Sequence, residues 1–213
     1  KIRDQTLVHW SGRHRPALTG QGVFPRPLQN PLPVHIGVGG TPQSFVRAGK
    51  LGLPLAVAII GGDPGHFRPL IDRYRAAGED AGHAPEQLTV AVHSIGFLAD
   101  TAAQARETFW PGYRDTFTRI GRERGWPPVT RPQYDAVTSP AGALVVGDPG
   151  MVADKILAEH ESLGGLNRIN IQIDNGALTH REIMHAIELL RTRVAPRVRQ
   201  ELAARLAATT GIK

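Results

Sequence analysis

Residues 34–44, VHIGVGGTPQS, decide the fold of this chain. The first part of the stretch, residues 34–38, has the composition of a buried strand. The glycines after it permit a tight turn, and Thr41-Pro42 places a capping hydroxyl before a proline at the first helical position. The stretch therefore predicts a strand that turns directly into a helix.

The same strand-to-helix order repeats along the rest of the chain. Strands are predicted over residues 34–38, 55–60, 88–98 and 168–173. Three of these runs are mainly apolar without regular alternation, which is typical of strands buried on both faces of a parallel sheet. Helices are predicted to start at Thr41-Pro42, Asp63-Pro64 and Asp148-Pro149, and to end at Gly164-Gly165 and Pro196. This order indicates βαβ units and an α/β fold.

Two segments depart from that order. Residues 1–33 contain so many glycines and prolines that we predict a long irregular linker there. Residues 100–147 form an insertion, with a helical stretch over 102–124 and a proline-rich stretch over 126–140. Insertions of this kind often lie at the carboxyl edge of the strands, so this one is expected to form a wall of a substrate pocket.

Composition limits the possible functions. The 213 residues, of which 41% are hydrophobic, suffice for one domain. The absence of cysteine excludes disulfides, thiol nucleophiles and iron–sulfur clusters. The longest apolar run, residues 53–60, is too short to cross a membrane, and a cytoplasmic location is expected. The net charge of +6 is dispersed over helical stretches, so no nucleic-acid partner is expected.

The turn after the first strand has the features of a phosphate site. Free backbone N–H groups and the positive end of a helix dipole meet there, and the hydroxyls of Thr41 and Ser44 add donors. The two comparable turns instead carry Asp63 and Asp148, whose carboxylates would cap their own helices and repel an anion. The alternative interpretation is that the glycines and Thr41 only form a tight turn.

Other motifs are mostly absent. Pro42 stands where the dinucleotide fingerprint G-x-G-x-x-G requires its third glycine, and no P-loop, H-E-x-x-H or G-x-S-x-G motif occurs. No metal site is predicted from the nine histidines. His93 interrupts an apolar strand, where it could line a pocket or be a core histidine with a backbone partner. Aromatic residues at helical spacing predict a packed helix face more readily than a nucleic-acid stacking platform: Phe109, Trp110, Tyr113 and Phe117.

Several segments, in their order along the chain, resemble the carboxyl-terminal half of a luciferase-like flavin-dependent oxidoreductase. These segments are PLPVHIGVGGTPQS from Pro31, LGLPLAVAIIGGDP, VAVHSIGFLADT, VGDPGMVADKIL and LGGLNRINIQID. The resemblance implies a (β/α)8 TIM barrel, of which residues 34–213 would supply strands five to eight with their helices. It also implies that FMN, or the deazaflavin F420, is held through its phosphate. The residues expected to bind this cofactor are Gly39, Gly40, Thr41, Gln43 and Ser44.

The resemblance implies a monooxygenase that uses reduced FMN and O2 on a small organic substrate. In this family a separate flavin reductase often delivers the reduced FMN, so such a reductase is an expected partner. In this family most residues near the flavin ring come from the first four strands, to which this chain has no matching segments. No catalytic residue is therefore assigned from the resemblance. Two alternatives stay open: a half barrel that binds or assembles without chemistry, or a fragment of a longer protein. A half barrel would leave two parallel strand edges unpaired, so a homo-oligomer is expected.

Overall fold

The computed structural model describes residues 4–210 and divides into two compact units, residues 1–35 and residues 36–213. In the first unit, β1 (Leu7–Trp10) and β2 (Leu18–Gly22) form an antiparallel pair whose register shifts between Val8 and His9. The prediction that residues 1–33 form one long loop is therefore wrong in this part. The prolines concentrate after residue 24, which leaves residues 17–24 free of proline and able to pair.

The second unit has the predicted strand-to-helix order. Its elements are β3 (Ile36–Val38), α1 (Pro42–Lys50), β4 (Leu55–Ile59), η1 (Pro64–Phe67), α2 (Arg68–Asp80), η2 (Pro85–Gln87), β5 (Val90–Leu98), α3 (Ala102–Arg124), α4 (Arg131–Thr138), β6 (Val145–Gly147), α5 (Pro149–Ser162), β7 (Arg168–Gln172), α6 (His180–Leu189), η3 (Leu190–Val194) and α7 (Ala195–Thr210). All the strands predicted from the sequence are present, with β6 as an addition.

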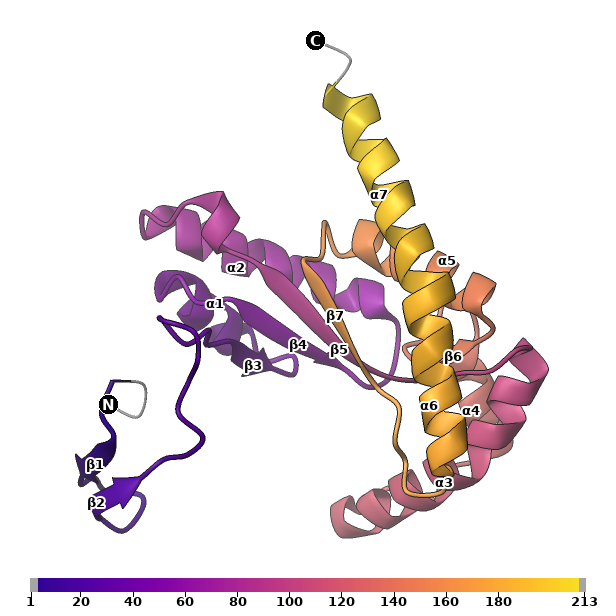
Figure 1. The fold of residues 1–213 in the computed structure, drawn as a ribbon, viewed down its shortest axis with the longest axis horizontal. Helices are drawn as coiled ribbons and strands as arrows, with labels where there is room; N and C mark the ends of the chain where they lie inside the picture. Colours follow the sequence, from indigo (N-terminus) through magenta and orange to yellow (C-terminus); the bar gives the residue numbers. More distant parts are fainter. Residues whose placement is uncertain (1–3, 211–213) are drawn as a thin grey trace. The chain divides into compact units, whose positions relative to one another are not determined.

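These strands form one parallel sheet (Figure 1). β3 pairs with β4, β4 with β5, and β5 with β7, all in parallel register. The short strand β6 pairs with the carboxyl end of β5, at Gly96 to Leu98. The parallel sheet with connecting helices confirms the predicted α/β class.

One face of the sheet is covered by helices. Val57 of β4 and Val92 of β5 lie in a buried cluster with Phe45 of α1 and Tyr74 of α2. The Tyr74 hydroxyl donates hydrogen bonds to the carbonyl oxygens of Leu53, at 3.2 Å, and of Thr89, at 3.3 Å. Burial raises the pKa of Tyr74 to about 12, so this hydroxyl keeps its proton. The helices α1 and α2 are thereby fixed on this face.

The other face of the sheet is more open. Ala58, His93 and Asn170 lie in register on it, across β4, β5 and β7. Along β4 buried and partly exposed residues alternate, and β7 alternates between exposed and partly exposed residues. The prediction of burial on both faces is therefore wrong for these strands. The second face of β7 carries Arg168, Asn170 and Gln172, whose polar side chains do not form a core.

The sheet has two unpaired edges. In the part of the chain that the structure describes, β3 pairs only with β4, and β7 only with β5. On the helix-covered side, an apolar groove of about 370 Å³ lies beside β7, with Ile169, Val194 and Val198 in its wall. A closed barrel has no unpaired edges, so the sheet formed by the described residues is open at both sides.

The insertion is more helical than predicted. α3 covers Ala102–Arg124 as expected, and the proline-rich segment after it contains the unpredicted helix α4. Thr130 and Gln133 form a capping box at the start of α4, and Pro132 lies in the first turn, where the missing N–H costs nothing. Proline therefore helps to begin this helix.

The predicted helix end at Pro196 is wrong. α6, the π-helical segment η3 and α7 follow each other without a break, and Figure 1 shows α7 continuing from α6. A proline inside an α-helix removes a hydrogen bond, and its ring crowds the preceding turn. The π turn of η3 changes the hydrogen-bond spacing directly before Ala195, so Pro196 is the second residue of a new α-helical segment.

Candidate functional site

The predicted phosphate site is a turn between β3 and α1. β3 ends at Val38, Thr41 is the N-cap of α1, and Gly40 has a φ of +118°, which favours glycine. A Cβ atom added at Gly39 or Gly40 would meet nothing within 4 Å among the described residues. Packing within the chain therefore gives no reason for a glycine at position 39, and space for a ligand remains above the backbone.

The three helix starts differ in how they are capped. The Asp63 carboxylate accepts a hydrogen bond from Gly65 N at 2.8 Å. The Asp148 carboxylate accepts from Gly150 N at 2.8 Å and from Met151 N at 3.1 Å. The Thr41 side chain makes no capping hydrogen bond, and the first turn of α1 contains no acidic residue. Of these three helix starts, only that of α1 is left open to an anion.

The five residues predicted to bind the cofactor lie in this single turn because they are nearly contiguous. Thr41 and Gln43 are exposed, whereas Gly40 and Ser44 are partly buried. Ser44 N donates to Thr41 O at 3.0 Å, while the N–H of Gln43 donates to no group in the described part of the chain. The turn thus offers hydroxyl, amide and backbone donors around one position.

His93 lies on the open face of the sheet and is partly exposed, so it is not a core histidine. Its Nε2 atom is 3.3 Å from Oε1 of Gln172 on the neighbouring strand β7. As a core histidine, His93 would have a backbone partner. Its partner is instead the side-chain amide of Gln172. His93 pairs in register with Ala58, one residue beyond Val57, which itself pairs with Val38. His93 is therefore level with the residue that follows Val38, at the start of the turn before α1.

A hollow lies beside this pair, between α3 and the segment after β7. We call it the α3 hollow; its volume is about 190 Å³. Its lining residues are Ile95, Phe109, Tyr113, Thr116, Phe117, Arg119, Gln172, Asp174, Asn175 and Gly176. Thr116 donates to Asn175 O at 3.1 Å, and Asn175 donates to Phe109 O at 3.0 Å, so α3 is tied to that segment. The insertion thus forms a pocket wall at the carboxyl end of β7.

Gln172 and Asn175 line the hollow but are not among the site residues predicted from the sequence. The signal for Gln172 was the alternation in RINIQ, where Arg168, Asn170 and Gln172 occupy every second position. That alternation marks one face of a strand as polar. Asn175 gave no comparable signal, because its role depends on the position of α3.

The aromatic residues of α3 form a packed helix face, as predicted. The rings of Tyr113 and Phe117 are stacked with centroids 4.5 Å apart, and Phe109 stacks on Phe97 of β5 at 5.7 Å. Trp110 contacts Tyr134 of α4, with centroids 5.0 Å apart. The ring contacts of Phe109, Tyr113 and Phe117 hold these side chains in place in the wall of the α3 hollow.

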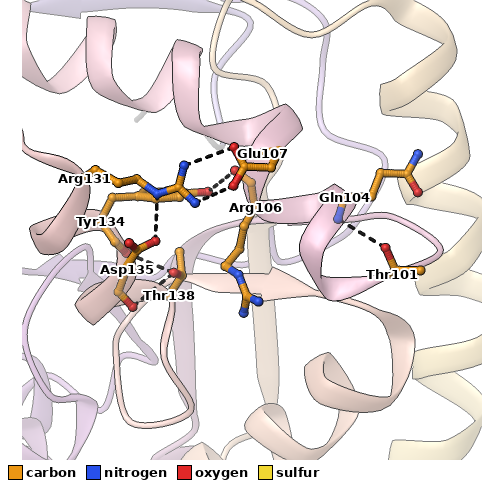
Figure 2. Close-up of polar contacts among 8 residues, drawn as sticks. All are labelled: Thr101, Gln104, Arg106, Glu107, Arg131, Tyr134, Asp135 and Thr138. Atoms are coloured by element: carbon orange, nitrogen blue, oxygen red, sulfur yellow. Dashed lines mark hydrogen bonds and ion pairs between the residues drawn. The ribbon is translucent and has the colours of Figure 1, made fainter.

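A polar network on the surface holds α4 against α3 (Figure 2). Arg131 donates to both carboxylate oxygens of Glu107 and also to Asp135 Oδ1, at 2.9 Å. The hydrogen bonds from Arg131 lower the pKa of the Glu107 carboxyl. Beneath this pair, the Tyr134 hydroxyl donates to Arg106 O at 3.0 Å. The network orients the insertion and does not face the hollow.

A buried polar pair lies on α5. Lys155 Nζ donates to the carbonyl oxygens of Ser139, at 2.8 Å, and of Leu144, at 2.5 Å. Burial lowers the pKa of Lys155 to about 8 and raises that of Glu159 to about 7. The Glu159 carboxylate is buried without a hydrogen-bond partner among the described residues. This pair ties α5 to the segment before β6, away from the residues of the phosphate turn.

Comparison with known proteins gives a family match. The model of the luciferase-like monooxygenase family matches residues 2–166. No curated protein matches the sequence. In the described part of the chain, no helix is both long and apolar enough to span a bilayer.

Solved structures resemble the fold at low sequence identity. Monooxygenase RslO1 from Streptomyces bottropensis is 21% identical, with a TM-score of 0.65 over 92% of this chain and 57% of that chain. The oxygenating constituent of 3,6-diketocamphane monooxygenase from Pseudomonas putida, in complex with FMN, is 18% identical, with a TM-score of 0.63 over 92% and 59%. The coenzyme F420-dependent tetrahydromethanopterin reductase from Methanopyrus kandleri is 16% identical, with a TM-score of 0.60 over 92% and 59%. The chain therefore spans less than two thirds of these structures.

Proposed function

Because the chain belongs to the luciferase-like monooxygenase family, we propose that it is the cofactor-phosphate half of an FMN-dependent monooxygenase. In this proposal reduced FMN and O2 oxidise a small organic substrate. The neighbouring structures include one in complex with FMN and one that depends on coenzyme F420. A flavin-type cofactor is common to both.

One observation carries the proposal: α1 begins without an acidic or self-capping side chain, whereas Asp63 and Asp148 cap their own helices. A phosphate at the α1 turn would receive N–H groups and the positive end of the helix dipole. The residues that hold it would be Gly39, Gly40, Thr41, Gln43 and Ser44. Their donors fit a phosphate better than a neutral group, because charge-assisted hydrogen bonds are the stronger ones.

The chain's own residues bind and orient in this proposal. When bound, the flavin supplies the redox and oxygen chemistry. The α1 turn would anchor one end of the cofactor, and β5 lies two strands away from β3 in the sheet. Two strand spacings are about 10 Å, so a cofactor anchored at the turn can reach the open face of β5. The aromatic face of α3 would keep water from that region.

Coenzyme F420 is the second cofactor candidate, because it also carries a phosphate group and one F420-dependent structure shares the fold. A separate flavin reductase would be a partner of the FMN-dependent enzyme. The unpaired edges of β3 and β7 favour closure of the barrel by further strands. These strands would come from a second copy of the chain or from a longer polypeptide. A non-catalytic binding subunit is the alternative if no flavin binds.

A flavin titration tests the phosphate site. The purified chain is titrated with FMN and, in parallel, with riboflavin, which lacks the phosphate; binding is followed by quenching of flavin fluorescence. We expect FMN to bind at least about tenfold more tightly than riboflavin, which corresponds to about 1.4 kcal/mol. Thr41→Asp should remove this preference, because the new carboxylate would occupy the phosphate position.

The matched control is Thr130→Asp, the same substitution at the N-cap of α4. This variant should keep the wild-type preference for FMN. Equal affinity for FMN and riboflavin in the wild-type chain would contradict the phosphate site, as would an unchanged preference in the Thr41→Asp variant.

A further inference from the structure

The exposed Gln172 side chain lines the α3 hollow and contacts His93. Its Oε1 atom lies 3.3 Å from Nε2 of His93, which donates the hydrogen because a carbonyl oxygen can only accept. Because this hydrogen bond uses only the oxygen of the amide, the NH2 group on its other side can still donate to another group. In the described part of the chain, this NH2 group donates no hydrogen bond, and Gln172 lines the hollow. A donor is therefore available at the wall of the hollow.

Four of the other nine residues that line the hollow are aromatic or apolar. Ile95, Phe109, Tyr113 and Phe117 contribute to the lining, and the rings are held in place by stacking on one another and on Phe97. The volume is about 190 Å³. An apolar cavity of about 150 Å³ accommodates benzene. The α3 hollow therefore has the size for one substituted aromatic ring.

The charges at the hollow balance. Arg119 and Asp174 both line it, and they carry opposite formal charges. A carboxylate ligand would be attracted by Arg119 and repelled by Asp174. The balance favours an uncharged ligand whose polar atom is an acceptor facing Gln172.

We propose that the α3 hollow binds a small uncharged aromatic molecule with a carbonyl oxygen, which accepts a hydrogen bond from the Gln172 amide. His93 is the positioning residue that holds the amide in the donating orientation. If this ligand is also the substrate of the enzyme, that role rests on the proposed function. The binding site itself depends on the geometry of α3, β5 and β7.

The test uses the whole 213-residue chain without flavin. Acetophenone is compared with α-methylstyrene, in which a methylene group replaces the carbonyl oxygen, and with benzoate. Dissociation constants come from chemical-shift changes in ¹H–¹⁵N spectra. We expect Gln172→Met to reduce the preference for acetophenone over α-methylstyrene by about 3- to 10-fold, the range of one hydrogen bond. Gln87→Met, the same change at an exposed residue of η2, should leave the preference unchanged.

His93→Phe tests the positioning role separately. Gln172 is retained but can rotate, so the preference should fall by about 2- to 5-fold. An unchanged preference in this variant would overturn the role of His93. The binding site is overturned by an unchanged preference in Gln172→Met, by tighter binding of benzoate than of acetophenone, or by no binding of any probe. Flavin is absent throughout, so failure of the FMN titration and failure of this test are separate results.

Discussion

Thr41 and Asp148 occupy the same position at a helix start, directly before a proline, but only Asp148 caps its helix through its side chain. Two hydrogen bonds from the following turn end on the Asp148 carboxylate, at 2.8 and 3.1 Å. The helix that begins at Thr41 thereby keeps its N-terminal donors for another group. The same sequence pattern therefore caps one helix through its side chain and leaves the other helix start without such a cap.

Of the two residues Thr41 and Asp148, only Asp148 should therefore stabilise the fold by side-chain capping. We expect Asp148→Ala to lower the free energy of unfolding by about 1 kcal/mol, because the N–H groups of Gly150 and Met151 lose their partner. Thr41→Ala should change it by less than about 0.5 kcal/mol, because no capping hydrogen bond is lost. Urea denaturation measures both variants. Equal losses would contradict the difference in capping.

Two glycines of the α1 region should respond in opposite ways to alanine. A Cβ at Gly49 would lie 2.2 Å from Tyr74 O and 3.0 Å from Gly78 N, so α1 and α2 would have to separate. We expect Gly49→Ala to destabilise the fold by about 1–3 kcal/mol, despite the better helix propensity of alanine.

Gly39→Ala is the matched variant at the proposed phosphate site. Nothing in the described chain lies within 4 Å of the added Cβ, so stability should change by less than about 0.5 kcal/mol. FMN affinity should fall, because the methyl group keeps the backbone from the phosphate oxygens. Thermal unfolding and FMN titration of the two variants give the comparison. A stable Gly49→Ala variant, or unchanged FMN affinity in Gly39→Ala, would contradict it.

The two tyrosines of the insertion should differ in the importance of their hydroxyls. The Tyr134 ring is buried, and its hydroxyl donates to Arg106 O at 3.0 Å. Tyr134→Phe should cost about 1 kcal/mol of unfolding free energy, since the partly buried hydrogen bond to the Arg106 carbonyl is lost. Tyr113 has its ring centroid 5.2 Å from that of Tyr134, but no hydrogen bond of its hydroxyl occurs in the described chain. Tyr113→Phe should leave the free energy of unfolding nearly unchanged. Chemical denaturation measures both variants, and equal losses of unfolding free energy would contradict the prediction.

Glu159 should make stability depend on pH. Burial raises its carboxyl pKa to about 7 in the folded chain, against about 4.5 in the unfolded chain. Between these values the folded chain keeps a proton that the unfolded chain releases, so the free energy of unfolding falls as the pH rises. From about pH 5 to about pH 7, wild type should lose about 2 kcal/mol relative to Glu159→Gln.

Denaturation curves at several pH values check this dependence. Glu123→Gln, at an exposed position of α3, is the control and should run parallel to the wild type. A constant difference between wild type and Glu159→Gln across this range would show that the Glu159 carboxyl titrates normally.

Much of the fold could be predicted because it depends on local sequence. The cap pairs at Thr41, Asp63 and Asp148 mark helix starts through backbone geometry that needs no distant contact. The errors occurred where a local signal was ambiguous. Pro196 reads as a helix end, yet the π turn before it lets the chain continue as a helix. The proline-rich segment around Pro132 reads as irregular, yet the proline begins α4.

The strand-to-helix order, the uncapped turn at Thr41 and the family can be inferred without a structure, because each is encoded in contiguous residues. The covered face of the sheet, and the contact of His93 with Gln172, 79 residues later in the chain, follow from tertiary packing. Tertiary packing also places α3 beside the end of β7 to form the α3 hollow. Strand register and helix docking bring these groups together, and both depend on the packing of side chains that are distant in sequence.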